Sequence, residues 1–155
     1  MSDRLLKHDR ESWLSIQRRV FQEMEDWLDR AVNVRHLSDD ARIAKMVTEA
    51  ILHRAQQMIW TVFDYVVMPN HIHLFLEIRE GSLKSTMEGF KRWTGHEAGK
   101  LIDLKGKSFW QDEWFDHWSR SDEEDERIIV YIRNNPVKAG LVARYRDWPY
   151  GSWAQ

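Results

Sequence analysis

Two histidines separated by one residue are the most chemically suggestive feature of this sequence. His71 and His73 flank Ile72 and follow Pro69-Asn70, a pair typical of a turn. If this segment is a β-strand, residues i and i+2 point to the same face, so both imidazoles project from one side. Two such imidazoles can converge on one divalent ion, although a histidine pair with other partners on a strand surface is an open alternative.

A tyrosine and an asparagine four residues apart form the second candidate group. Tyr131 and Asn135 fall on one face of a predicted helix, one turn from each other. An amide oxygen could complete the coordination of an ion held by two histidines, and the phenol would then lie beside that ion. Tyrosine is a weak nucleophile at its usual pKa of about 10, but an ion that polarises a phosphate compensates for this. The alternative is that Tyr131 is a core residue and Asn135 a helix C-cap before Pro136.

The composition bounds the class of protein that carries these groups. The chain has 155 residues, of which 43% are hydrophobic and 31% charged, which is typical of a single globular domain over residues 1–155. The absence of cysteine excludes disulfides, thiolate zinc sites and iron–sulfur clusters. No run approaches the roughly 20 apolar residues of a membrane span, and the first residues lack the apolar block of a secretory signal. We therefore expect a cytoplasmic protein.

Hydrophobic spacing predicts helices and strands around these groups. Trp13, Val20 and Met24 belong to the stripe of an amphipathic helix, so the region 1–30 is expected to be helical. Runs of β-branched and aromatic residues predict strands, and Ser121 before an acidic stretch predicts a helix start. The expected order is helix 11–28, a helix capped by Ser38, strand 58–67, strand 71–79, a helix from Leu83 to Leu101, strand 109–118, and a helix from Ser121 that stops at Asn134-Asn135-Pro136.

The net charge of −2 conceals a strong segregation of charge along the chain. Residues 84–107 carry six basic and three acidic side chains, and residues 127–155 carry five basic and one acidic. Residues 108–126, between them, carry eight acidic side chains and one basic. The two basic blocks could form a phosphate-binding face, whereas solvated helix faces would account for the same pattern.

Four motifs follow one another in an order that resembles one protein family. They are Val66-Val67-Met68-Pro69-Asn70-His71-Ile72-His73, then Phe109-Trp110-Gln111 with Asp116-His117, then Tyr131-Ile132-Arg133-Asn134-Asn135-Pro136-Val137-Lys138-Ala139-Gly140-Leu141-Val142, then Asp147-Trp148-Pro149-Tyr150. From about Trp27 to Trp153 the chain resembles the REP-associated tyrosine transposases. These belong to the single-strand DNA nucleases named for their His-hydrophobic-His motif.

The resemblance implies a fold, a site and an activity. The implied fold is an α/β (α+β) sandwich, in which a ferredoxin-like antiparallel sheet carries the histidines and a helix carries the tyrosine. His71, His73 and Asn135 match the metal ligands, and Tyr131 matches the nucleophile. Such enzymes use Mg²⁺ or Mn²⁺ and no nucleoside triphosphate, and they join a DNA 5′-phosphate to the tyrosine while freeing a 3′-hydroxyl. The implied partner is single-stranded or hairpin DNA of the REP type, and the implied process is DNA transposition.

Basic residues of the two blocks are the expected DNA contacts, because lysine and arginine bind backbone phosphates. The candidates are Lys91, Arg92, Arg133, Lys138 and Arg144.

The N-terminal region departs from the family. The family normally opens with a strand that lies in the middle of the catalytic sheet, whereas residues 11–28 have helical spacing. With strands only at 58–67, 71–79 and 109–118, unpaired backbone groups beside the catalytic strands would need partners. We therefore expect either an antiparallel homodimer that pairs across the gap, which we favour, or a rearranged N-terminus packed along it.

Two other functions are compatible with these residues. A non-catalytic protein could keep a hairpin-binding surface without cleaving DNA, although the presence of all four site residues argues against simple decay. A metal-dependent hydrolase could combine the histidine pair with Asp64 or Glu77, but Glu77 would lie near the far end of its strand.

Overall fold

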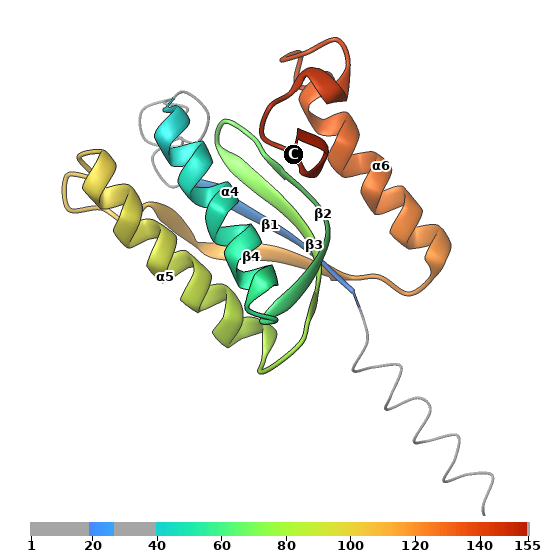
Figure 1. Cartoon of the computed structure of the whole chain (residues 1–155), viewed down its shortest axis with the longest axis horizontal. Helices are drawn as coiled ribbons and strands as arrows, with labels where there is room; N and C mark the ends of the chain where they lie inside the picture. Colours follow the sequence, from blue (N-terminus) through green and yellow to red (C-terminus); the bar gives the residue numbers. More distant parts are fainter. Residues whose placement is uncertain (1–18, 27–39, 155) are drawn as a thin grey trace, which may run out of the picture.

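The computed structural model describes residues 19–26 and 40–154, which form an antiparallel sheet with helices on both faces (Figure 1). The strands are β1 (Val20–Asp26), β2 (Trp60–Val67), β3 (His71–Ile78) and β4 (Trp110–Trp118), in the spatial order β2-β3-β1-β4. The helices are α4 (Ala41–Gln56), α5 (Leu83–Leu101) and α6 (Asp122–Lys138), followed by the short 3₁₀ helices η1 (Tyr145–Asp147) and η2 (Ser152–Ala154). The expected α/β sandwich with an antiparallel sheet is confirmed.

The expected gap in the sheet does not exist, because β1 fills it. This strand, predicted as part of a helix over residues 11–28, pairs antiparallel with β3 on one side and with β4 on the other. The helical prediction was wrong here because a central strand is covered on both faces. Val20 and Phe21 are adjacent and both buried, so no alternation of apolar and polar residues marks the strand. Residues 11–18 and 27–28 of the predicted helix lie outside the described residues.

The argument for a homodimer that completes the sheet therefore disappears. The outer strands are β2 and β4, and the C-terminal segment covers the edge of β2. The N–H of Val67 donates to the carbonyl oxygen of Tyr150 at 2.8 Å, and the indole N–H of Trp148 donates to the carbonyl oxygen of Val67 at 3.0 Å. Bonds of this kind satisfy backbone groups that an open sheet edge would leave unpaired.

The helices cover both faces of the sheet. α4 and α5 lie side by side on one face, and α6 lies on the other (Figure 1). Leu74 of β3 belongs to the core under α4 and α5, whereas Phe75 of β3 and Ile132 of α6 belong to the core on the opposite face. Because successive side chains of a strand point to opposite faces, His71 and His73 share the face of Phe75 and α6.

Short polar side chains begin the helices. The hydroxyl of Ser121 accepts a hydrogen bond from the N–H of Glu124 at 3.1 Å, which confirms the predicted cap of α6. The cap of α4 is Asp40, whose carboxylate accepts from the N–H of Arg42, while the predicted cap Ser38 lies outside the described residues. None of the described helices is long and apolar enough to cross a membrane.

α6 continues past the point where the sequence predicts its end. We expected Asn134-Asn135-Pro136 to stop it, but it runs to Lys138 with Pro136 buried inside the last turn. Pro136 cannot donate to the carbonyl oxygen one turn before it, but the helix continues, because the N–H of Ala139 bonds to the carbonyl oxygen of Asn135 at 2.9 Å. Asn135 is therefore a residue of the helix and not its cap.

Replacing Phe21 by alanine should destabilise the protein strongly, because the ring is buried in the central strand and its loss would leave a cavity. We expect the free energy of unfolding, measured by urea denaturation, to fall by about 3–5 kcal/mol. Phe115→Ala on β4 is the matched control, since that ring is 58% exposed, and it should cost less than about 1 kcal/mol. Equal small effects of the two substitutions would contradict the position of β1.

Candidate active site

His71 and His73 lie at the start of β3 with their ring nitrogens close together. Their Nε2 atoms are 3.1 Å apart. The Nδ1 of His71 lies 2.7 Å from the Oδ1 of Asn70, so the ring N–H donates to that amide oxygen and Nε2 keeps its lone pair. The turn before β3 therefore orients the first histidine.

His73 is buried, with 1% of its surface exposed. Its ring stacks on Phe21 of β1, with 5.2 Å between centroids and 17° between planes. Burial, and then the neighbouring His71, lower the pKa of His73 to about 3, so the ring is neutral around neutral pH. Its buried Nδ1 has no hydrogen-bond partner within the part of the chain that the structure describes. Ring contact with β1 therefore orients the second histidine.

Asn135 approaches the histidines from α6. Its side-chain nitrogen lies 3.0 Å from the Nε2 of His73. Half a turn of the amide exchanges its nitrogen and oxygen, so this position can also present an oxygen to the histidine pair. The structure thus brings together the three residues that the sequence predicts as ligands.

These donors fit a divalent ion. Adjacent ligands of an octahedral ion with bonds of about 2.1 Å are about 3 Å apart, and the two Nε2 atoms are separated by 3.1 Å. Imidazole nitrogen and amide oxygen are suitable ligands for Mn²⁺, and oxygen ligands suit Mg²⁺. No group of three or more histidine or carboxylate side chains that could hold an ion occurs among residues 19–26 and 40–154. Among the side chains that the structure describes, the two histidines and the amide are therefore the candidate donors.

Tyr131 lies against His73 with much of its ring accessible. Its ring centroid is 5.4 Å from that of His73 and 5.8 Å from that of Phe21, and both contacts are edge-on. The residue is 47% exposed. A core residue would be covered, so the alternative role of Tyr131 in the core does not hold. A phenol beside two histidines and an amide is an arrangement suited to nucleophilic attack on an ion-bound phosphate.

An ion pair between a buried carboxylate and a partly exposed arginine holds the tyrosine helix on the sheet. Asp64 of β2 is fully buried, and its carboxylate accepts from the Nε of Arg133 at 3.1 Å. The hydroxyl of Ser152 and the N–H of Tyr65 also donate to this carboxylate. Because Arg133 is two residues after Tyr131, the pair fixes the part of α6 that carries the phenol. The hypothesis of a hydrolase with Asp64 as a metal ligand is therefore wrong, because the carboxylate oxygens of Asp64 bond to these other groups.

Comparison with known proteins gives these residues a context. A profile of the family described as "Transposase IS200 like" matches residues 31–135, which includes the histidine pair, Tyr131 and Asn135. This chain belongs to the IS200-like transposase family. The match covers more than half of the chain and agrees with the resemblance to REP-associated tyrosine transposases.

Two relatives connect this IS200-like transposase chain with the REP-associated group. A REP-associated tyrosine transposase of Escherichia coli (strain K12) is 27% identical over 111 residues, which are 70% of this chain and 64% of that protein. The chain therefore covers less than two thirds of this relative's length. A solved structure of a REP-associated tyrosine transposase bound to a REP hairpin has a TM-score of 0.72 and 24% identity, over 88% of this chain and 77% of the other. At this identity the likeness concerns the fold.

The basic residues expected to bind DNA do not form one continuous surface on this transposase fold. Lys91 and Arg92 lie on α5, on one side of the sheet, whereas Arg133 and Lys138 lie on α6, on the other side (Figure 1). Arg144 directly precedes η1. Any DNA that contacted all five would have to pass around an edge of the sheet.

Three of these five residues also have bonds within the protein. The Lys91 ammonium donates to two backbone carbonyls of β4, and burial lowers its pKa. Arg144 pairs with Asp147 at 3.1 Å, and Arg133 pairs with the buried aspartate of β2. The side chains that are exposed and have no ion pair among the described residues are those of Arg92 and Lys138.

Two residues that support the site were not predicted. Phe21 was placed in a helix, and no local pattern indicated that its ring would meet His73. Asn70 adjoins His71 in the turn, and a short polar side chain next to a candidate ligand is a usable signal, because ligand histidines are commonly oriented by such partners.

Removing the charge of Asp64 tests the role of the buried ion pair. Asp64→Asn should lower the free energy of unfolding by about 2–3 kcal/mol, less than for a fully buried pair because Arg133 is partly exposed. Asp147→Asn removes the exposed partner of Arg144 and should cost less than about 1 kcal/mol. Chemical denaturation compares the two variants, and equal losses would show that the Asp64 pair does not anchor α6.

Proposed function

We propose that this chain is a metal-dependent endonuclease and strand transferase for single-stranded DNA that forms a 5′-phosphotyrosine intermediate through Tyr131. One observation carries the proposal: an accessible tyrosine ring lies 5.4 Å from a buried, neutral histidine whose Nε2 adjoins a second histidine and an amide. Membership of the IS200-like transposase family supports DNA as the substrate.

The residues that would hold the ion are His71, His73 and Asn135. When bound, Mg²⁺ or Mn²⁺ would supply positive charge that polarises the scissile phosphate and stabilises the transition state. Asn70 would hold the proton of a neutral His71 on Nδ1 and so direct the Nε2 lone pair at the ion. Burial would keep His73 neutral, so that ring would not repel a cation.

The tyrosine would carry the covalent step. The Tyr131 oxygen attacks phosphorus, the bond from phosphorus to the 3′-oxygen breaks, and the 5′-phosphate stays on the tyrosine. The phenol loses a proton and the departing 3′-oxygen gains one, so the products are a phosphotyrosine ester and a 3′-hydroxyl. One phosphodiester replaces another, so the bond energy is retained and a second 3′-hydroxyl can reverse the step and join strands.

The proposed substrate is hairpin DNA of the REP type. A related transposase of the same fold is bound to a REP hairpin, which supports this choice. Lys91, Arg92, Arg133, Lys138 and Arg144 are the proposed DNA contacts, and the exposed Arg92 and Lys138 are the ones most available to phosphates. A hairpin-binding protein without cleavage activity is the alternative, and the accessible phenol beside the donors argues against it.

Tyr131→Phe separates these functions, because it removes the nucleophilic oxygen and keeps the ring that contacts His73. We expect the variant to bind a REP hairpin oligonucleotide as the parent protein does, and to form no covalent adduct on a denaturing gel. Tyr145→Phe is the control, since Tyr145 lies on η1 and should leave adduct formation unchanged. An adduct with Tyr131→Phe would refute the assignment, and a parent protein that binds without an adduct would favour the binding function.

Substitutions of His71 and of its partner Asn70 test whether the site binds an ion. His71→Ala should abolish ion-dependent cleavage, and Asn70→Ala should weaken Mn²⁺ affinity by about 10–100-fold because it removes the partner that orients His71. Mn²⁺ titration followed by electron paramagnetic resonance measures the affinity without DNA. His96→Ala, an exposed histidine on α5, should change neither quantity. Undiminished cleavage in excess chelator would rule out the metal role.

A further inference from the structure

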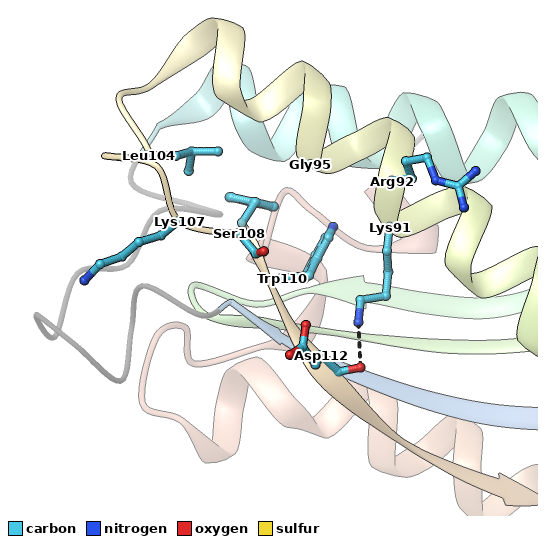
Figure 2. Close-up of a pocket in the computed structure, with 9 residues that line it drawn as sticks. Lys91, Arg92, Gly95, Leu104, Lys107, Ser108, Trp110 and Asp112 are labelled. Atoms are coloured by element: carbon cyan, nitrogen blue, oxygen red, sulfur yellow. Dashed lines mark hydrogen bonds between the residues drawn. The ribbon is translucent and has the colours of Figure 1, made fainter.

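A pocket lies on the side of the sheet away from the tyrosine. It has a volume of about 320 Å³ and is formed by α5, the loop over residues 102–109 and the start of β4 (Figure 2). Its wall residue Trp110 belongs to the core under α4 and α5, whereas Phe21, which contacts the tyrosine, belongs to the core on the opposite face. The pocket is thus separate from the candidate active site.

The inner wall of the pocket is aromatic and fixed. The indole N–H of Trp110 donates to the hydroxyl of Thr94 at 2.7 Å, which holds the ring in place. Gly95 leaves the space in front of it open, because an added Cβ would lie 3.8 Å from the Cβ of Phe109 and 4.0 Å from the Cδ1 of Trp110. A larger side chain at position 95 would therefore occupy the pocket.

The rim of the pocket is charged, with an excess of cations. Arg92 and Lys107 stand at opposite ends, and Lys91 reaches from α5 to the backbone of β4 between them (Figure 2). Asp112 is the acidic residue of the lining. The aromatic wall suits a flat polar group, and the three cations of the rim suit an anion attached to that group.

We propose that this pocket binds one unpaired nucleotide of the DNA substrate. The base would enter against the wall that Trp110 and Gly95 form, and Asp112 would accept a hydrogen bond from an exocyclic amino group. Arg92 and Lys107 would bind the phosphates on either side of that nucleotide. Thymine fits the carboxylate less well, because it has no amino group and its N3–H donor lies between two carbonyl oxygens that a carboxylate repels. This inference rests on the proposed function, because it takes single-stranded DNA as the substrate.

The topology connects this pocket to the tyrosine. β4 is an outer strand, and its first residue, Trp110, pairs with Asp26 of β1. The neighbouring Glu25 of β1 pairs with His71 of β3, so the pocket lies at the end of the sheet where the histidine strand begins. A DNA strand held in the pocket can pass around the edge of β4 to the face that carries Tyr131.

Mononucleotides test the pocket without any cleavage. Amide NMR spectra of the full chain, recorded with deoxycytidine monophosphate, should show saturable shifts at Gly95, Ser108 and the Trp110 indole with a Kd of about 1 mM. Thymidine monophosphate should bind at least about threefold more weakly, because its N3–H donor lies between two carbonyl oxygens that repel the Asp112 carboxylate. Gly95→Met should remove these shifts, whereas Gly89→Met, at a helix glycine with open space around it, should keep them.

A variant without the two rim cations tests the phosphate contacts, and a REP hairpin oligonucleotide tests the pocket with the proposed substrate. The double variant Arg92→Ala and Lys107→Ala should bind the nucleoside deoxycytidine as the parent protein does. It should lose the higher affinity that the parent protein has for deoxycytidine monophosphate. With a REP hairpin oligonucleotide, Gly95→Met should raise the Kd about tenfold, whereas Gly89→Met should leave it unchanged. Absence of shifts at Gly95 and Trp110 at about 10 mM nucleotide, or equal shifts in Gly95→Met, overturns the pocket. Absence of an adduct in the parent protein contradicts the proposed function instead.

Discussion

The ion pair between Asp64 and Arg133 is the interaction on which the arrangement of the site depends. A fully buried carboxylate is costly unless charges and hydrogen bonds satisfy it. Here the satisfying groups come from three places: Arg133 of α6, Ser152 of the C-terminal segment and the backbone of β2 itself. α6 therefore has a defined rotation about its axis, and that rotation places Tyr131 and Asn135 over the histidine strand.

The site is assembled from segments that are distant in the sequence. β1 supplies Phe21, which contacts both His73 and Tyr131, and the turn before β3 supplies Asn70. Each group on the histidine side is thus oriented by a neighbour that takes no part in the chemistry. Such preorganisation matters because a nucleophile gains most when it is held close to its target before reaction.

Much of the site could be predicted from the sequence, because its signals are local. Two histidines at i and i+2 share a face of any strand, and Tyr131 and Asn135 share a face of any helix. β1 could not be predicted, because its adjacent buried residues Val20 and Phe21 give no period of two and the apolar residues of this segment also fit a helix. The continuation of α6 through Pro136 depended on packing against the sheet, which has no local signature. From the sequence, Asp64 is only a candidate metal ligand, because no local signal identifies Arg133 as its partner.

The central claim is that Tyr131 is the group that becomes bonded to DNA. Trypsin cuts after Arg127 and Arg133, so the peptide Ile128–Arg133 contains Tyr131 and no other tyrosine. The protein would be incubated with hairpin DNA and Mn²⁺, the DNA trimmed with a nuclease, and the tryptic peptides analysed by tandem mass spectrometry. The account predicts a nucleotide attached through its 5′-phosphate to Tyr131 of this peptide. A nucleotide on Tyr145 or another residue, or cleaved DNA with every tyrosine unmodified, would contradict it.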